Sequence, residues 1–299
     1  MAELEAIKFS LTKAFHKKPY PSISPLRPEL SKAGKTVLIT GGGGGIGFHI
    51  AKAFLQASAA TVVIVGRREG FIQDAATKLG QQFPEAQVVG LRCDVAESDD
   101  VEALWADLKA RGILVDVLVL NATIVPPMAP LLEVGTKVIM ESYNVNLKGN
   151  LDMTEHFYKQ EGSRKGVTKR NSSDGYLVHV STVAAHNFIT AAKMLTYGLS
   201  KNAGALAMQL IAQDTKVEEM QIVTFNPGPV YTPGAASTGI PEDGFDWNDV
   251  RGLGRFPEAA FLHGRFVWNE WDVDEMKSGD LRKKIDEDPT YLRIGVHGI

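Results

Sequence analysis

The chain contains 299 residues, of which 44% are hydrophobic and 22% are charged, a composition that allows a globular protein with a sizeable core. Its formal net charge of −3 at pH 7 gives no reason to expect a nucleic acid or an anionic membrane surface as a partner. The single cysteine, Cys93, excludes an intrachain disulfide and a thiolate metal cluster, and we predict no metal site.

The first 33 residues are polar and carry four prolines, at positions 19, 21, 25 and 28. Because proline fixes φ and lacks a backbone donor, we predict an extended N-terminal arm over residues 1–33, ahead of the fold. This stretch lacks the apolar segment of a signal peptide, and no apolar run in the chain approaches the roughly 18 residues of a membrane span. We therefore expect a cytoplasmic protein.

From residue 36 onward, apolar runs alternate with helical patterns. The runs are nearly continuously apolar, as strands covered on both faces should be. The predicted strands are residues 36–40, 61–66, 88–93, 115–121, 175–181, 221–226 and 264–269. The predicted helices are residues 47–56, 71–83, 98–111, 135–160 and 195–215, with Ser98 as a candidate N-cap. This alternation predicts an α/β fold with a doubly wound parallel sheet in a single domain, residues 34–299.

A glycine-rich turn joins the first strand to the first helix, where residues 40–47 read TGGGGGIG. Glycine allows a sharp turn with positive φ and lets a phosphate approach the backbone. The helix start presents unpaired N–H groups to that phosphate. A strand before the turn and a helix after it favour a dinucleotide site over a structural tight turn.

The end of the second strand predicts which dinucleotide binds. Residues 65–68 read VGRR, without the carboxylate that binds the ribose 2′-OH of NAD. Arg67 can form a charge-assisted pair with a 2′-phosphate, and Arg68 can assist it. We therefore predict NADP(H) as the cofactor; the alternative is an ordinary solvated pair of arginines.

Tyr197 and Lys201 are four residues apart in a predicted helix and therefore share one face. A free phenol titrates near ~10, and a neighbouring ammonium lowers its pKa. Such a pair can exchange the proton that accompanies hydride transfer to or from a carbonyl. The alternative is a chance pair on an amphipathic surface helix.

Three further polar residues are candidates for the site. Ser181 and Thr182 follow an apolar strand, at the end of the sheet where substrate should lie, although a cap or turn would also explain them. Asn146 interrupts a long helical pattern, which indicates either a kink that binds water or a solvent-facing side chain.

Together these features resemble the short-chain dehydrogenase/reductase family over about residues 34–270, and imply a Rossmann-type fold. The matched pieces, in the family's order, are residues 40–47 (TGGGGGIG), 93–95 (CDV), 120–123 (LNAT), Asn146, Ser181-Thr182, 197–201 (YGLSK) and 227–232 (PGPVYT). The N-terminal arm and residues 264–272 resemble fungal members of the family, some of which act in secondary metabolism.

The resemblance implies a role for each matched position. Tyr197 would be the acid/base, Lys201 would lower its pKa and hold the nicotinamide ribose, and Thr182 or Ser181 would orient the carbonyl. Asn146 would hold a water in a proton relay. The implied cofactor contacts are Gly41, Gly43, Gly44, Gly45, Ile46, Gly47, Arg67, Arg68, Asp94, Val95, Asn121, Ala122, Tyr197, Lys201, Pro227, Gly228, Val230 and Thr232. Of these, Asp94 would contact the adenine, Asn121 the adenosine-side ribose region and Thr232 the carboxamide end.

The chain departs from the family's pattern in three places. Residues 120–123 read LNAT where the family usually has Asn-Asn-Ala-Gly. The usual serine position is occupied by Thr182 or is shifted to Ser181. The separation between Thr182 and Tyr197 is slightly longer than usual, and an insertion within residues 185–196 would reshape the substrate pocket. Residues 233–257, rich in glycine and proline, are a candidate substrate lid, whereas residues 162–175 read as a surface loop.

We therefore predict an NADP(H)-dependent oxidoreductase that acts on a carbonyl or alcohol of a small molecule. Two alternatives are an isomerase, dehydratase or cyclase on the same scaffold, and a non-catalytic nucleotide-binding regulator. Related enzymes pair the helices at 135–160 and 195–215 across a two-fold axis, so we expect a homodimer or homotetramer. The apolar residues on these helices include Val138, Ile139, Leu147, Leu206 and Leu210.

Overall fold

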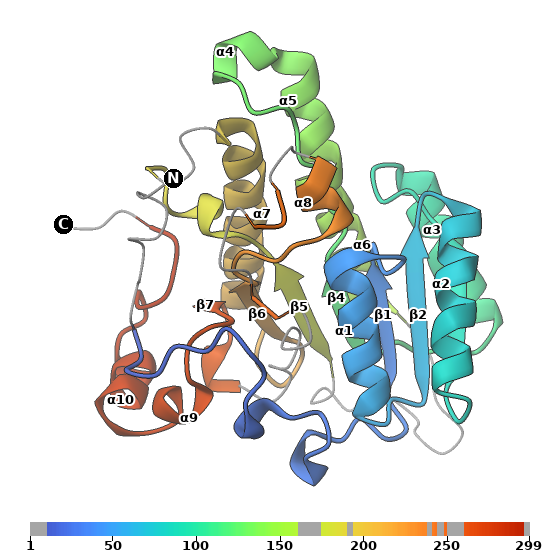
Figure 1. Ribbon diagram of the computed structural model, residues 1–299, viewed down its shortest axis with the longest axis horizontal. Helices are drawn as coiled ribbons and strands as arrows, with labels where there is room; N and C mark the ends of the chain where they lie inside the picture. Colours follow the sequence, from blue (N-terminus) through green and yellow to red (C-terminus); the bar gives the residue numbers. More distant parts are fainter. Residues whose placement is uncertain are drawn as a thin grey trace.

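The computed structural model describes residues 11–160, 175–189, 194–237, 241–243, 248–249 and 260–295. Within that part of the chain a seven-stranded sheet has the order β3-β2-β1-β4-β5-β6-β7, and every neighbouring pair is parallel. Helices cover both faces of the sheet (Figure 1). The predicted doubly wound α/β fold is confirmed.

The strands are β1 (Thr36–Thr40), β2 (Thr61–Gly66), β3 (Gln87–Arg92), β4 (Val117–Leu120), β5 (Tyr176–Val180), β6 (Gln221–Asn226) and β7 (Arg265–Trp268). The larger helices are α1 (Gly45–Gln56), α2 (Glu69–Gln82), α3 (Ser98–Ala110), α5 (Thr136–Tyr143), α6 (Gly149–Lys159), α7 (Leu195–Asp214) and α10 (Gly279–Glu287). Shorter elements are α4 (Leu131–Val134), α8 (Pro233–Ser237), α9 (Val273–Met276), the 3-10 turns η1 (Pro21–Ile23), η2 (Pro28–Leu30), η4 (Val183–Ala185) and η6 (Ala260–Leu262), and the π-helix η3 (Asn144–Lys148).

The continuous apolar character of the strands is explained by two separate hydrophobic cores. Along β1, Val37 and Ile39 belong to a core that also contains residues of α1, α2 and α10. Leu38, between them, belongs to a second core with residues of α3, α6 and α7. Because successive side chains of a strand point to opposite faces, every position of β1 is buried.

The strand order places the topological switch between β1 and β4. The chain runs from β1 outward through β2 to β3, then returns to β4 on the other side of β1. The helices that follow β1 and β4 therefore leave the sheet on opposite faces, and ligands of such sheets bind at the carboxyl ends of these strands. In Figure 1 the carboxyl ends of the strands lie at the top of the sheet, where the arrow of β2 points.

The predicted helix over residues 135–160 is confirmed, with a local change of helix type in its middle. The structure divides it into α5, one π-helical stretch at residues 144–148, and α6. Asn146 lies in the π-helical stretch, and its side chain bonds to residues outside the helix. A π-helical turn inside an α-helix adds a residue and re-aims its side chains, commonly at functional sites.

The predicted cap at Ser98 is also wrong. The N-cap of α3 is Glu97, and no side chain caps it. The Ser98 hydroxyl instead donates to Asp152 of α6 at 2.8 Å and accepts from Lys148 at 2.6 Å. Asp100, in the first turn, accepts from the backbone N–H of Asp94 at 2.9 Å and thereby fixes the loop after β3.

The described part of the N-terminal arm packs against the C-terminal segment that follows β7. His16 Nε2 lies 2.7 Å from a carboxylate oxygen of Asp272, and the Tyr20 hydroxyl accepts a hydrogen bond from the backbone N–H of Val273 at 2.8 Å. Phe15 forms an antiparallel bridge with Trp271. Figure 1 shows the same contact, with the blue N-terminal segment beside the red helices α9 and α10. The two ends of the chain therefore stabilise one another.

Candidate active site

The glycine turn at the end of β1 requires glycine for steric reasons. Gly41 and Gly45 have φ values of +67° and +51°, a region that other residues rarely adopt. A Cβ on Gly47 would lie 2.3 Å from the carbonyl oxygen of Gly41. Helix α1 begins at Gly45, and no side chain caps its first turn. Its first N–H groups are therefore available to an anion such as a pyrophosphate.

The side chains of Thr40 and Asn121 hold this turn in place by hydrogen bonds. Asn121 Nδ2 donates to the carbonyl oxygens of Thr40 at 2.9 Å and of Gly41 at 3.2 Å. The Thr40 hydroxyl accepts from the backbone N–H groups of Asn121 at 2.9 Å and of Ala122 at 3.0 Å. These bonds join the ends of β1 and β4. Asn121 therefore shapes the turn directly, a role distinct from the ribose contact that the resemblance implies.

Both predicted arginines follow β2 and are exposed. The Arg68 guanidinium stacks 4.3 Å above the ring of Phe71. That ring lies against the turn, since a Cβ on Gly43 or Gly44 would come within 2.8 Å or 3.0 Å of it. The positive charge at the end of β2 is therefore next to the proposed phosphate site and open to a ligand.

The remaining predicted cofactor residues come from loops after β3 and β6. Asp94 is half-buried, and its carboxylate accepts from the backbone N–H of Ala96 at 3.1 Å. Val95 is buried against α6, where its carbonyl oxygen would lie 2.4 Å from a Cβ on Gly149. Thr232 contacts the glycine turn, because a Cβ on Gly45 would lie 3.4 Å from its side chain. The loop after β6 thus comes close to the glycine turn that follows β1.

A buried carboxyl group fixes the loop of Pro227, Gly228 and Val230. Gly228 has a φ of +71°, and a Cβ there would lie 2.0 Å from Glu270 Oε1. Asn248 Nδ2 donates to Glu270 Oε1 at 2.7 Å and to the carbonyl oxygen of Pro227 at 3.0 Å. Burial raises the pKa of Glu270 above its ordinary value. Residues after β7 therefore support the loop that the resemblance places on the nicotinamide side.

Asn146 is fully buried and connects three segments. Its Oδ1 accepts from the Thr123 hydroxyl at 2.8 Å and from the backbone N–H of Ile124 at 3.0 Å. Its Nδ2 donates to the carbonyl oxygen of Ile124 at 3.1 Å and to the Ser200 hydroxyl at 2.9 Å. The solvent-facing interpretation of Asn146 is therefore wrong. The kink is present, but the amide binds protein groups.

Tyr197 and Lys201 extend from α7 toward the carboxyl ends of β4 and β5. Burial raises the pKa of Tyr197 to about 12, and a hydrogen bond with the side chain of Thr123 acts in the opposite direction. Lys201 is 2% exposed, and its Nζ donates to the carbonyl oxygen of Val180 at 2.8 Å. Burial lowers the pKa of Lys201 to about 8. The surface-pair interpretation is wrong, since both groups are shifted by burial.

The two candidate hydroxyl groups after β5 differ in accessibility. Ser181 is 3% exposed, and its hydroxyl has no hydrogen-bond partner among the described residues. Thr182 is half-buried, and its hydroxyl accepts from the backbone N–H of Ala184 at 3.3 Å, which caps η4. The capping interpretation of Thr182 is confirmed. Thr182 is also the more accessible of the two to a substrate.

Sequence reasoning missed His179, the buried neighbour of Lys201. His179 lies on β5, its Nδ1 is 3.4 Å from the Thr224 hydroxyl, and its Nε2 has no partner among the described residues. Burial, followed by the charge of Lys201, lowers the pKa of His179 well below its ordinary value. The only signal in the sequence was a single basic residue within an otherwise apolar strand.

Two predicted segments lie wholly or largely outside the described residues. These are the surface loop at 162–175 and the candidate lid at 233–257, of which only α8 and residues 241–243 and 248–249 are described. No helix in the described ranges combines the length and hydrophobicity of a membrane span.

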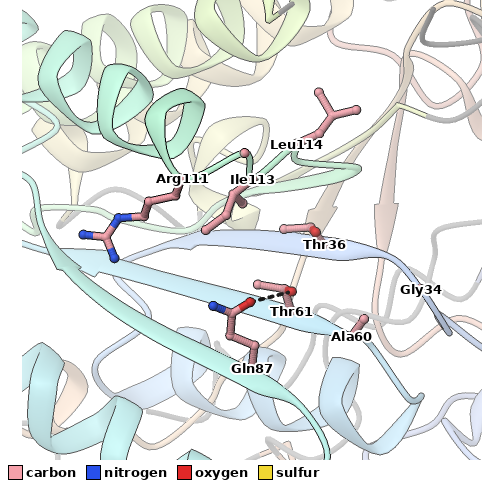
Figure 2. Close-up of a pocket in the computed structure, with 9 residues that line it drawn as sticks. Gly34, Thr36, Ala60, Thr61, Gln87, Arg111, Ile113 and Leu114 are labelled. Atoms are coloured by element: carbon pink, nitrogen blue, oxygen red, sulfur yellow. Dashed lines mark hydrogen bonds between the residues drawn. The ribbon is translucent and has the colours of Figure 1, made fainter. Parts of the chain in front are cut away.

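A surface pocket of about 390 Å³ lies at the opposite end of the sheet. Figure 2 shows the residues that line it, among them Thr36, Thr61, Gln87 and Arg111. These residues mark the amino ends of β1, β2 and β3, with the end of α3 beside them. Ligands of open α/β sheets bind at the carboxyl ends. This pocket is therefore not the candidate active site.

Comparison with known proteins gives consistent matches. Residues 35–242 match the family model described as short chain dehydrogenase. A short-chain dehydrogenase/reductase, nsrO, from Aspergillus novofumigatus is 30% identical, over 95% of this chain and 96% of the relative. One from Claviceps purpurea is also 30% identical, over 95% and 94%. AacuD from Aspergillus aculeatus is 29% identical over 95% and 96%.

Solved structures support the fold. A putative gluconate dehydrogenase from Agrobacterium tumefaciens superimposes with a TM-score of 0.70 at 19% identity, over 81% of this chain and 96% of that chain. The L-sorbose reductase from Gluconobacter frateurii, complexed with NADPH and L-sorbose, superimposes with a TM-score of 0.67 at 19% identity, over 80% and 96%.

The buried ammonium of Lys201 should make the unliganded protein's stability depend on pH. The folded protein releases this proton at about pH 8, before the unfolded chain does, so stability should rise with pH above that value. Relative to Lys201→Met, the wild type should gain about 2 kcal/mol in free energy of unfolding between about pH 7.5 and about pH 9.5. Denaturant unfolding at both pH values measures this. The control is Lys78→Met, which removes an exposed ammonium. A stability difference between the wild type and the Lys201→Met variant that stays constant with pH contradicts the prediction.

Proposed function

Because this chain belongs to the short-chain dehydrogenase/reductase family, we propose that it transfers a hydride between NADP(H) and a carbonyl or alcohol of a small molecule. The observation that carries the proposal is that half-buried Tyr197 and buried Lys201 share one face of α7, with Lys201 bonded to the carboxyl end of β5, the same end of the sheet as the glycine turn. When bound, the nicotinamide supplies or accepts the hydride; the protein supplies position and charge.

Tyr197 is the proposed acid/base. With a pKa raised by burial to about 12, its phenol holds its proton at neutral pH in the unliganded protein. It is therefore ready to donate that proton to a carbonyl oxygen during reduction. Lys201 holds a positive charge below about pH 8, which favours the phenolate that remains. Thr182, half-buried at the end of β5, is the proposed group that orients the carbonyl.

The apolar side chains around the site support a small-molecule substrate with apolar surface. Val125 and Met128 on the loop after β4 are exposed, as are Phe188 and Ile189 on the loop after β5. Both loops begin at the carboxyl ends of strands, the end of the sheet at which the proposed site lies. Exposed apolar groups of this kind gain free energy when a ligand covers them.

We further propose an isologous homo-oligomer built on α6 and α7. Leu151 and Tyr158 on α6, and Leu199 and Leu210 on α7, leave large apolar side chains exposed. The apolar faces of α6 and α7 are therefore not fully covered by packing against the sheet, and a second copy of the same chain would bury them.

NADP(H) should bind more tightly than NAD(H), because Arg67 and Arg68 follow β2 with exposed side chains and residues 65–68 contain no carboxylate. Arg67→Ala should weaken NADPH binding at least about tenfold and leave NADH binding nearly unchanged, since only NADPH carries the 2′-phosphate. Isothermal titration calorimetry with both cofactors measures this. Arg111→Ala, at the amino end of the sheet, is the matched control. Wild-type protein that binds NADPH no tighter than NADH would overturn the cofactor assignment.

Tyr197→Phe should reduce turnover at least about a hundredfold and change cofactor affinity little, because it removes one hydroxyl and keeps the ring. The assay follows absorbance at 340 nm with NADPH and a panel of ketones and aldehydes that the wild type reduces. Tyr158→Phe, on the exposed face of α6, is the control. If Tyr197→Phe keeps most of the activity, the acid/base assignment is wrong. If the wild type oxidises no NADPH with any ketone or aldehyde tested, an isomerase, dehydratase or cyclase is favoured.

A further inference from the structure

Glu270 and Asn248 form a buried pair that the proposed chemistry does not use. Glu270 follows β7 and is 2% exposed, and Asn248 is 4% exposed. Asn248 Nδ2 donates to Glu270 Oε1 at 2.7 Å. The other oxygen of each side chain, Glu270 Oε2 and Asn248 Oδ1, is buried and has no hydrogen-bond partner among the described residues. The pair therefore leaves two buried oxygens without a donor.

The protonation state of Glu270 decides whether these two oxygens can be satisfied. An ionised carboxylate and an amide oxygen only accept hydrogen bonds, so an ionised Glu270 would leave both oxygens without a donor and would bury a negative charge. A neutral carboxylic acid carries one O–H donor. An acid and a primary amide each offer the other one donor and one acceptor, so a single proton on Oε2 supplies the donor that Asn248 Oδ1 lacks.

The surrounding charges do not require Glu270 to be ionised. Burial raises the pKa of Glu270, and this effect outweighs the hydrogen bond from the amide and the charge of Lys17, which both lower it. The other titratable groups on the segments packed here are two carboxylates and one imidazole. His16 and Asp272 pair with each other at 2.7 Å. Asp249 adds a further carboxylate, and its backbone N–H donates to the carbonyl oxygen of Lys17 at 2.8 Å.

The backbone of the loop after β6 lies directly against this pair. Gly228 has a φ of +71°, and a Cβ there would lie 2.0 Å from both Asn248 Nδ2 and Glu270 Oε1. The carbonyl oxygens on either side of Gly228 both accept from Asn248: that of Pro227 from Nδ2 at 3.0 Å, and that of Pro229 from the backbone N–H at 2.7 Å. This stretch carries no titratable side chain. Asn248 therefore positions the loop, and Glu270 holds Asn248.

We propose that Glu270 is a positioning residue that holds Pro227–Pro229 as a neutral acid, by donating its carboxyl proton to Asn248 Oδ1. The resemblance places this stretch on the nicotinamide side, so the consequence for the cofactor rests on the proposed NADP(H) site. Loss of the proton to solvent removes the donor and puts a buried negative charge against Gly228. The loop then loses the support that fixes it, and a protein with ionised Glu270 should bind the cofactor poorly.

Glu270→Gln is the matched variant, because its carboxamide has the shape of the neutral acid and cannot ionise. Its Nε2 donates where the acid's O–H would, and its Oε1 accepts from Asn248 as before. The variant should fold, bind NADPH as the wild type does at low pH, and keep that affinity as the pH rises. Glu102→Gln, which changes an exposed glutamate on α3, is the control.

Carbon-13 NMR measures the proton on Glu270 without any cofactor. The full-length chain is labelled at the carboxyl carbons of its glutamates, and the resonance that disappears in Glu270→Gln is assigned to Glu270. Its shift is then followed against pH. Glu270 should titrate above the exposed glutamates and should still carry its proton when they are ionised. In Glu102→Gln the Glu270 resonance should titrate as in the wild type.

The affinity for NADPH, measured by calorimetry about one pH unit below and about one above that midpoint, tests the positioning of the loop. About one unit above its pKa, a group is protonated in roughly one molecule in eleven, so the wild type should lose about tenfold in affinity relative to Glu270→Gln. Taking the ratio to Glu270→Gln removes the titration of the cofactor's own phosphate. Glu102→Gln should follow the wild type.

Three results overturn the proposal. A Glu270 resonance that titrates with the exposed glutamates shows an ionised carboxylate at neutral pH. NADPH affinities that change in parallel in the wild type and Glu270→Gln show that the proton does not position the loop. A Glu270→Gln protein that does not fold shows that an amide cannot replace the acid. A wild type that binds neither NADPH nor NADH rejects the proposed function instead, and the titration, which needs no cofactor, still decides the state of Glu270.

Discussion

The candidate site depends on one buried carboxamide. Asn146 has no exposed surface, and a buried amide without partners would cost several kcal/mol, so its donors and acceptors must be satisfied by protein. They are satisfied by the loop after β4 and by α7. The loop after β4 is therefore held against α7, and α7 lies where Lys201 reaches the end of β5. The π-helical stretch at residues 144–148 turns the amide toward both partners.

A second constraint operates at the neighbouring end of β1. The glycine turn has no side chains of its own to hold it, so Thr40 and Asn121 supply the bonds that fix it. Both bonds cross from β1 to β4, which are adjacent only because the strand order reverses there. The nucleotide side and the acid/base side of the site thus share the end of β4. Glu270, which follows β7, supports the loop at Gly228 together with Asn248.

The sequence is enough to predict those strands, turns and helix faces that depend on residue type and on spacing along the chain. The bounds of β1, β2 and β6 agree with the prediction, because strands buried on both faces are continuously apolar. The positive φ of Gly41 and the shared face of Tyr197 and Lys201 follow from residue type and spacing. A kink at Asn146 is one of the two interpretations of the sequence, but the partners of its side chain could not be predicted, since they lie more than 20 residues away, Ile124 and Ser200 among them. Nor could the choice between Ser181 and Thr182, which depends on burial by other elements.

Hydrogen exchange at Ile124 tests the central role of Asn146 most directly. The backbone N–H of Ile124 donates to Asn146 Oδ1, so Asn146→Leu, which keeps the side chain's size and removes the amide, should open this N–H to solvent. Loss of one buried hydrogen bond predicts exchange at least about tenfold faster at Ile124, with no change at Leu38 in the centre of β1. Unchanged exchange at Ile124 would show that the loop after β4 is held by other contacts, and that the site is not organised around Asn146.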